Sequence, residues 1–251
     1  MTNRCDTAQD GTLTAVPQPP AATVRHPHLG KPKRPGWVRV DLHSHTMWSG
    51  DSTTTPDELE RAVVESGLDV LCITDHNATR GAEAMAGFLP CRVVVGEELR
   101  THAGEIIGLF LTDRVPFGIS ARQAADQIHA QGGIVYVPHP FDPMRRNLAE
   151  TTLVELTDAG VVDAIEVINA KTSLAHLNER AAAFANQYGL LAGAGSDAHV
   201  PDALGAAYVE MPDFDGPREF LVALAQGVVV GHYYDAPRAW TPRIVPSTGE
   251  N

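Results

Sequence analysis

The chain has 251 residues, of which 43% are hydrophobic and 20% are charged, a balance typical of a folded protein rather than a disordered or fibrous one. The formal net charge of -12 at pH 7 repels a nucleic-acid backbone, so we expect no stable nucleic-acid complex. The odd cysteine count, with Cys5, Cys72 and Cys91 far apart in the chain, argues against a disulfide framework and against a structural zinc knuckle.

The sequence carries no signal for export or for membrane insertion. Its N-terminus lacks a basic region followed by an apolar run and a cleavage site, and no stretch approaches the roughly 18 apolar residues of a membrane span. Together with the cysteine pattern, this favours a cytoplasmic protein that has no contact with a membrane. The sequence leaves the oligomeric state open.

Composition divides the chain into three parts. Residues 1–36 are rich in Thr, Ala and Pro and have no periodic apolar pattern, so we expect a disordered leader there. Residues 37–235 have the apolar periodicity of a single domain, and residues 236–251 are expected to form a flexible tail.

Strand and helix patterns alternate along this domain. It begins with Val38 and Leu42 on one face of a strand, and Thr55 and Glu58 then form the capping box of a helix that begins at Pro56. Strands are predicted at 38–42, 68–74, 92–96, 106–111, 134–137, 161–168, 190–194 and 228–230, and helices at 56–67, 120–131, 174–188 and 217–226. Such alternation favours a parallel sheet or barrel, because parallel neighbours need a crossover that is usually a helix.

Polar motifs follow several of these strands, at the strand ends where ligands of parallel folds gather. The motifs are DLHSHT with His43 and His45, ITDH with His76, GEE with Glu97 and Glu98, VPHPFD with His139, and GSDAH with Asp197 and His199. Residues two apart on an extended segment point to the same side, so His43 and His45 can hold one metal ion. Each motif alone is weak, because a His-x-His pair on a strand is as often structural, but together they predict a site.

The other histidines do not follow predicted strands in this way. They are His26, His28, His102, His129, His176 and His232. We assign them no role in the site, apart from a substrate contact considered for His102.

The ordered motifs resemble the PHP family, the polymerase and histidinol phosphatase superfamily, over about residues 38–210, and the GEIIGL segment resembles its small stand-alone members. The resemblance implies an α/β fold, a distorted (β/α)7 barrel similar to a TIM barrel. It also implies two or three divalent metal ions at the strand ends and hydrolysis of phosphate esters. Manganese, iron and zinc are the metals expected, with magnesium as a further option.

The resemblance also implies a set of ligands. One metal would be held by His43, His45, Glu98 and Asp197, a second by Glu98 and His139, and a third by Asp51, His76 and His199. Glu98, Asp197 and His199 are the predicted catalytic residues, and Glu97 is expected to support the ligands from behind.

Two positions depart from the family pattern. Asp51 aligns only with a one-residue insertion at Gly50, and Glu105 stands where the family has a histidine. We predict that Glu105 is a carboxylate ligand, which favours manganese, iron or magnesium over zinc. The alternative is that the second metal has been lost.

A net positive charge remains when four carboxylates hold three divalent cations, and this charge attracts phosphate. Such cations polarise the phosphoryl oxygens, lower the pKa of a bound water and stabilise the leaving oxygen, so no protein nucleophile is needed. Arg145 and Arg146 follow His139 closely enough to bind the phosphate from a loop, and Arg100 and Lys171 are weaker candidates.

The sequence therefore predicts hydrolysis of phosphate esters by metal-activated water in a di- or trinuclear site, with a small phosphomonoester or a nucleotide as substrate. Within the same chemistry, the alternatives are a phosphodiesterase or exonuclease that acts on short oligonucleotides, and a histidinol-phosphate phosphatase. Two further alternatives are a hydrolase of carbon–nitrogen or other bonds, and a non-catalytic, metal-stabilised module that partners a larger enzyme.

Overall fold

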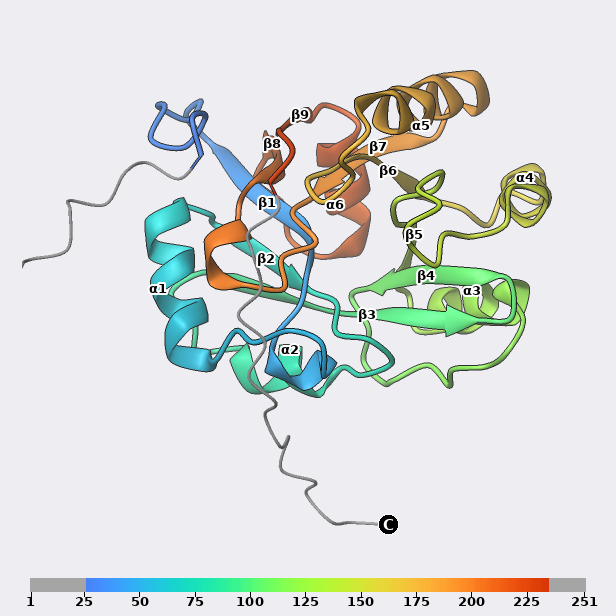
Figure 1. Ribbon diagram of the computed structural model, residues 1–251, viewed down its shortest axis with the longest axis horizontal. Helices are drawn as coiled ribbons and strands as arrows, with labels where there is room; N and C mark the ends of the chain where they lie inside the picture. Colours follow the sequence, from blue (N-terminus) through green and yellow to red (C-terminus); the bar gives the residue numbers. More distant parts are fainter. Residues whose placement is uncertain (1–25, 235–251) are drawn as a thin grey trace, which may run out of the picture.

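The computed structural model describes residues 26–234 (Figure 1). Residues 1–25 of the predicted leader and the whole predicted tail, 236–251, lie outside the described residues. Within the described part, the chain forms nine β-strands and six α-helices. No helix between residues 26 and 234 is long and apolar enough to cross a membrane.

All nine strands of the described chain belong to one sheet, in the order β7-β6-β5-β4-β3-β2-β1-β8-β9. The strands are β1 (Trp37–Ser44), β2 (Val70–Ile73), β3 (Arg92–Thr101), β4 (Gly104–Leu109), β5 (Ile134–Val137), β6 (Ala164–Asn169), β7 (Leu191–Gly195), β8 (Ala207–Pro212) and β9 (Val228–Gly231). Each of the eight predicted strands overlaps one of these, with ends that differ by up to five residues.

The sheet curls until the end of β7 meets the end of β1. Asp197 N donates a hydrogen bond to His43 O at 2.7 Å, and His45 N donates one to Ala198 O at 2.9 Å. Along the same edge of β1, its first half pairs with β8, so β8 and β9 extend the sheet outside the barrel. The seven strands β1 to β7 therefore form a nearly closed barrel, and the distorted (β/α)7 barrel predicted from the sequence is confirmed.

Not all neighbours in the barrel are parallel. β4 runs antiparallel to both β3 and β5, whereas β1 to β3 and β5 to β7 pair in parallel. Only two residues, His102 and Ala103, separate β3 from β4. A parallel connection needs a crossover of a dozen or more residues, so this short turn can only join antiparallel strands.

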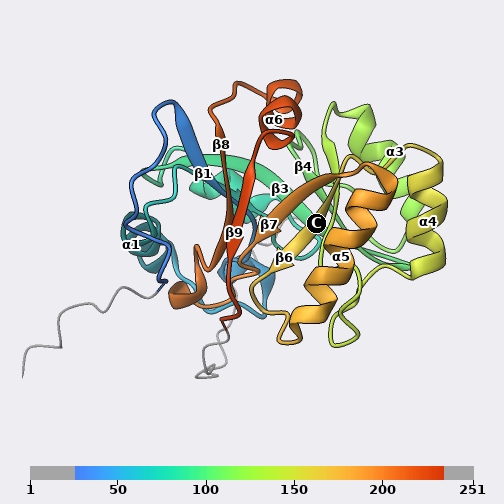
Figure 2. The same ribbon diagram turned by 90° about the horizontal axis from the view of Figure 1, so that it is seen from above.

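The helices surround the barrel (Figure 2). They are α1 (Pro56–Ser66), α2 (Arg80–Met85), α3 (Ala121–Ala130), α4 (Glu150–Asp158), α5 (Ala175–Tyr188) and α6 (Pro217–Leu224). The predicted capping box of Thr55 and Glu58 is present at the start of α1, which buries Leu59, Ala62 and Val63 against the sheet. The sequence patterns above do not predict α2, α4 or β8.

Large side chains fill the interior of the barrel. Tyr136 from β5 and Leu42 from β1 are both fully buried there. A Cβ atom on Gly193 of β7 would lie 2.6 Å from Tyr136 Cε2 and 3.0 Å from Leu42 Cδ2. The absence of a side chain at position 193 therefore lets β7 approach the interior residues closely enough to complete the barrel.

The stretch 26–36, which the composition assigns to the leader, packs against the barrel. His26, His28 and Leu29 are at most 9% exposed. His26 Nε2 bonds with Asp202 O at 3.1 Å, and His28 Nε2 bonds with Gly205 O at 3.0 Å. These imidazoles bond to two carbonyl groups of the 201–205 turn, so the stretch before Trp37 packs as part of the domain rather than as a leader.

We expect acidification to loosen this stretch. Burial, together with the nearby His232 and His28, lowers the pKa of His26 to about 4, below its unfolded value of 6.5. The unfolded form takes up the proton first, so the stabilisation is present above pH 6.5 and is lost as the pH falls towards 4. Hydrogen–deuterium exchange in residues 28–36, corrected for the intrinsic effect of pH, should be about tenfold faster at pH 5 than at pH 7.

The matched control is His26→Gln, whose amide can still donate a hydrogen bond but does not titrate in this range. It should remove most of the pH dependence of exchange. Equal protection of residues 28–36 at both pH values in the natural protein would contradict the expectation.

Candidate metal centre

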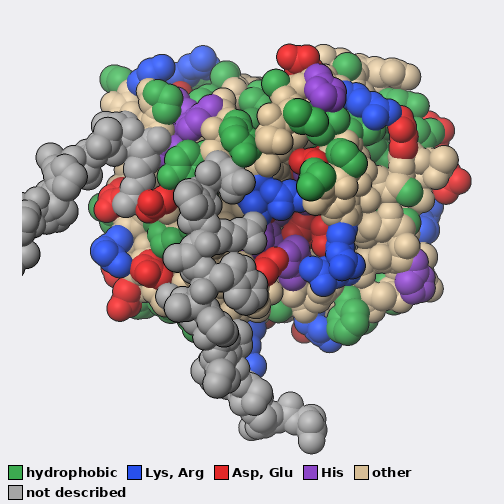
Figure 3. Space-filling model, viewed as in Figure 1, with side chains coloured by type: hydrophobic (Ala, Val, Ile, Leu, Met, Phe, Trp, Pro, Cys, Tyr) green, Lys and Arg blue, Asp and Glu red, His purple; other side chains and the backbone are tan. Residues whose placement is uncertain are grey.

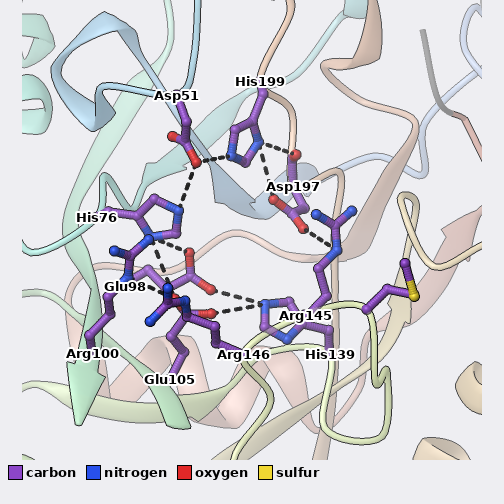
Figure 4. A pocket seen from close by; sticks show the side chains of 11 residues that line it. Asp51, His76, Glu98, Arg100, Glu105, His139, Arg145, Arg146, Asp197 and His199 are labelled. Atoms are coloured by element: carbon purple, nitrogen blue, oxygen red, sulfur yellow. Dashed lines mark hydrogen bonds and ion pairs between the residues drawn. The ribbon is translucent and has the colours of Figure 1, made fainter. Parts of the chain in front are cut away.

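The nine predicted metal ligands converge at one end of the barrel, and seven of them are seen to point towards a common cavity in Figure 4. They are His43 in β1, His45 after it, Asp51 in the following loop, His76 after β2, Glu98 in β3, Glu105 in β4, His139 after β5, and Asp197 and His199 after β7. All except Asp51 and His76 are nearly or fully buried. Residues separated by more than 150 positions in the sequence thus share one site.

The imidazole rings lie against one another. The ring centre of His45 is 5.1 Å from that of His43, 4.6 Å from that of His76 and 4.2 Å from that of His199. The rings of His43 and His139 are 5.6 Å apart. Neutral imidazoles are common metal ligands, so this packing places several ligand nitrogens within reach of the same ions.

Ligand atoms of His43, His45 and Glu98 cluster at the centre, and Asp197 lies beside the two imidazoles. His43 Nε2 lies 3.1 Å from His45 Nε2, 3.5 Å from Glu98 Oε2 and 3.8 Å from Asp197 Oδ1. His45 Nε2 lies 3.3 Å from Glu98 Oε2 and 3.5 Å from Asp197 Oδ1. Ligands about 2.05 Å from a tetrahedral ion are about 3.4 Å from one another, which is close to these five distances, although Glu98 and Asp197 belong to different clusters. These are the four residues assigned to the first metal from the sequence.

Glu98 connects this group to a second one. While its Oε2 atom faces the first group, its Oε1 atom lies 3.0 Å from His139 Nε2. Glu105 adds a carboxylate, with Oε2 4.0 Å from His139 Nε2 and Oε1 3.9 Å from His76 Nδ1. Glu98 therefore has the arrangement of a carboxylate that bridges two cations, and Glu105 lies where it can hold one of them.

Asp51 reaches the site despite the insertion at Gly50. Its Oδ2 atom lies 3.2 Å from His76 Nε2 and 3.3 Å from His199 Nε2. Gly50 has a φ of 82°, a left-handed conformation that costs glycine little and turns the chain back towards the barrel. Asp51, His76 and His199, the residues assigned to the third metal, thus form a third group.

The charges of the centre favour bound cations. Although burial opposes the charged form of His43, the carboxylates of Asp197, Glu166 and Glu98 hold its pKa well above the ordinary value. Burial also opposes the charged form of His76, but hydrogen bonds to Asp51 and Glu98 outweigh it and raise the pKa of His76 to about 10. Buried carboxylates thus draw positive charge into the site. Among the described residues, Asp51 Oδ1 and His139 Nδ1 are buried without a hydrogen-bond partner, so polar atoms remain for further ligands.

Glu166, in the middle of β6, supports the ligands from behind. It is fully buried, its Oε1 atom lies 3.2 Å from His43 Nδ1, and its Oε2 atom accepts hydrogen bonds from His139 N at 2.7 Å and from Asn169 Nδ2 at 2.9 Å. A carboxylate on one ring nitrogen fixes the tautomer and leaves the other nitrogen for a metal. The motifs do not include Glu166, although a single acid in the apolar run AIEVIN is a signal for it.

Glu97, expected to support the ligands, does not. Successive side chains of a strand point to opposite faces, so Glu97 faces away from Glu98. Its Oε2 atom accepts a hydrogen bond from Val115 N at 2.9 Å, and burial raises its pKa to about 7. Glu97 therefore belongs to the contact between β3 and the loop before α3, and its role in the site was wrongly assigned.

Two of the proposed ligands have strained backbones. His139 has a φ of 29° and Asp197 a φ of 50°, in a region that non-glycine residues rarely adopt. Each is held by hydrogen bonds, from His139 N to Glu166 and from Asp197 N to His43 O. Such strain persists only where the surrounding structure holds it, and it is concentrated at functional sites.

Basic side chains line the cavity beside the acids. The cavity has a volume of about 160 Å³, and Arg100, Arg145 and Arg146 contribute to its wall. Arg145 Nε lies 3.9 Å from Asp197 Oδ2, and Lys171 Nζ lies 3.4 Å from Asp197 Oδ1 and 2.9 Å from His199 Nδ1. Figure 3 shows the hollow, with Lys and Arg side chains around Asp, Glu and His. Arg145 and Arg146 thus line the cavity from the loop after β5, and Lys171 is buried beside Asp197 and His199.

We expect removal of Glu166 to weaken metal binding. Glu166→Ala leaves His43 Nδ1 without its carboxylate partner, and loss of such a partner typically lowers metal affinity about 10- to 100-fold. The metal affinity, measured by competition with a chelator, should fall by this factor, and Glu166→Gln should cause a smaller loss. Glu179→Ala, an exposed acid of α5, is the control and should bind as the natural protein does. Unchanged affinity in Glu166→Ala would contradict this role.

Comparison with known proteins agrees with this geometry. Residues 41–95 match the model of the PHP domain, and residues 175–229 match that of the PHP-associated family. The chain is 34% identical over 193 residues to an uncharacterized protein of Methanocaldococcus jannaschii, which covers 73% of this chain and 78% of that protein.

Solved structures share the fold. A two-domain protein of Bacteroides vulgatus, described as containing a predicted PHP-like metal-dependent phosphoesterase, aligns with a TM-score of 0.65 at 19% identity over 84% of this chain and 70% of that one. A lesion-specific endonuclease of Pyrococcus furiosus aligns with a TM-score of 0.58 at 15% identity over 77% of this chain and 57% of that one. The family matches, the archaeal relative and the clustered histidines and acids lead to one conclusion: the chain belongs to the PHP superfamily and has the fold of its metal-dependent phosphoesterases.

Proposed function

We propose that the protein hydrolyses phosphate esters, with a small phosphomonoester or a nucleotide as substrate, by metal-activated water in a di- or trinuclear site. The observation that carries this proposal is the position of Glu98, whose two oxygens face two separate groups of ligand atoms. Two closely spaced cations are the usual means of stabilising both the attacking and the leaving oxygen in phosphoryl transfer.

The residues of the site have separate roles in the proposed reaction. When bound, the cations supply a water of lowered pKa and a positive charge for the phosphoryl oxygens. Glu98 and Asp197 would bind the cations together with the neighbouring imidazoles of His43 and His45. Arg145 Nε is buried without a hydrogen-bond partner, so it can donate to a phosphoryl oxygen. Lys171, bonded to His199 Nδ1, orients that imidazole and adds positive charge beside Asp197.

The donor set indicates which metals fit. The predicted ligands are imidazole nitrogens and carboxylate oxygens, and no thiolate belongs to any of the clustered groups among the described residues. Such a set suits manganese, iron and zinc, and magnesium at the carboxylate-rich end near Glu105. Two or three such ions are therefore the proposed cofactors.

One relative favours a second substrate class. The endonuclease of Pyrococcus furiosus shows that this fold also occurs in an enzyme that cuts nucleic acid, so phosphodiester hydrolysis of short oligonucleotides is the second candidate. The net charge of -12 favours small substrates over a long polyanion. A panel of monoesters, cyclic nucleotides, histidinol phosphate and short oligonucleotides, incubated with manganese-loaded protein, would separate these candidates by the product released.

We expect His43→Ala and Asp197→Ala to abolish turnover while the fold survives. Each change removes a ligand atom from the central group. Phosphate release should fall at least about 1,000-fold, since the reaction depends on the cations that these residues hold. Circular dichroism should show that the helices and strands remain.

The matched control is His176→Ala, which changes an exposed histidine of α5 and should leave the rate as it is in the natural protein. Turnover at the natural rate in either site variant would end the proposed assignment of the ligands.

Variants at Glu105 test how many metals the site binds. We expect Glu105→Ala to lower the bound metal by about one equivalent per chain, because the cluster of His76, Glu98 and Glu105 then loses one of its two carboxylates. Metal analysis of the purified variant measures this loss. Glu105→His, which introduces the imidazole that the family pattern has there, should restore the metal content. The same metal content in the natural protein and in Glu105→Ala would show that Glu105 is not a ligand.

A further inference from the structure

A buried carboxylate outside the metal centre joins two of the loops that form the cavity. Asp142 lies in the loop after β5 and is 4% exposed. Its Oδ2 atom accepts a hydrogen bond from Thr172 Oγ1 at 2.9 Å, and Thr172 lies in the loop after β6, where it is also buried. The two loops are thus tied together through one side chain.

The same carboxylate shapes the turn that carries Arg145. Asp142 Oδ1 accepts a hydrogen bond from Met144 N at 2.9 Å, and Arg145 N donates to Asp142 O at 3.1 Å. At the start of the turn, Asp142 N donates to His139 O at 3.1 Å. A run of hydrogen bonds centred on Asp142 therefore leads from the proposed ligand His139 to Arg145.

Packing contributes little to the position of this turn. The side chain of Met144, at its tip, is 85% exposed and so buries almost no apolar surface. Beyond the turn, Arg146 O accepts a hydrogen bond from Glu105 N at 2.8 Å, which fixes the far side of the loop. Phe141, just before the turn, is 7% exposed and packs against Phe184, so its position is fixed by the core. From Asp142 to Arg145, by contrast, the hydrogen bonds of Asp142 restrain the backbone.

Arg145 needs such a restraint. Its Nε atom forms an ion pair with Asp197 Oδ2 at 3.9 Å but makes no hydrogen bond. A free arginine side chain loses about 2 kcal/mol of rotamer entropy when it is fixed, so its backbone must already be in place if it is to bind a phosphoryl group well. Asp142 itself does not line the cavity.

We propose that Asp142 is a positioning residue: by fastening the 142–145 turn to Thr172, it holds Arg145 over the metal centre and thereby sets the affinity for the phosphoryl group. This inference rests on the proposed function, since Arg145 is taken to bind the phosphate. It adds a role for the last residue of the VPHPFD motif, to which the sequence assigns none.

A double-mutant cycle tests the inference. Asp142→Ala, Arg145→Ala and the double variant are compared for kcat, KM and inhibition by inorganic phosphate. Asp142→Ala should raise KM and the inhibition constant of phosphate about tenfold, as Arg145→Ala does, with kcat changed much less. In the double variant, loss of Asp142 should add no more than about twofold to the effect of Arg145→Ala, because Asp142 acts through Arg145.

Conservative variants separate positioning from general damage. Asp142→Asn keeps an oxygen acceptor for Met144 N and can donate its amide to Thr172 Oγ1, so it should restore most of the affinity. Thr172→Val removes only the hydroxyl and should raise KM part of the way. Should Asp142→Ala fail to fold, Thr172→Val and Arg145→Ala form the same cycle. Metal content equal to that of the natural protein shows that the ligands are intact.

The outcomes are distinct. If the fold-changes in KM of the two single variants multiply in the double variant, Asp142 acts independently of Arg145. This result would overturn the inference while the proposed function stands. Absence of hydrolysis by the natural protein would instead overturn the proposed function. The cycle is then measured as binding of inorganic phosphate to the manganese-loaded protein by calorimetry, where non-additive losses would support the role of Asp142 and additive losses would refute it.

Discussion

The metal centre depends on the pairing of the end of β1 with the segment after β7. Two backbone hydrogen bonds, from Asp197 N to His43 O and from His45 N to Ala198 O, bring the first and last motifs of the sequence together. They place His43, His45 and Asp197 side by side, so the spacing of the central ligand atoms follows from barrel closure. Neighbouring strands lie about 4.8 Å apart, which is the separation at which side chains from two strands can share one ion.

Closure of the barrel by itself would be destabilising, because it buries the charged side chains of the site. Carboxylates and imidazoles taken out of water must be paired or must bind cations, since an isolated buried charge costs several kcal/mol. The chain meets this requirement in two layers, with Glu98 and Asp197 towards the cavity and Glu166 behind His43 and His139. The inner carboxylates can bind cations, and Glu166 in the outer layer fixes the orientation of the imidazole ligands.

Local patterns in the sequence predict what depends on neighbours in the chain, and they miss what depends on distant contacts. The strand 134–137 and the capping box of α1 follow from apolar runs and cap residues alone. The support of His43 by Glu166 joins residues 123 positions apart, and no local signal gives that distance. The packing of His26 and the burial of Lys171 likewise depend on contacts between distant parts of the chain.

Ligand and substrate residues also come from different parts of the fold. Most of the proposed metal ligands lie in strands or within a few residues of a strand end, where the sheet holds them rigidly, whereas Arg145 lies further out in a loop. Loops tolerate changes that strands do not, so relatives can keep the metals and change what binds beside them. A phosphoesterase and an endonuclease can therefore share this fold at 20% identity or less to the present chain. The residues that restrain such loops then determine the substrate as much as the basic side chains they carry, because a guanidinium recognises a phosphoryl group only from a fixed position.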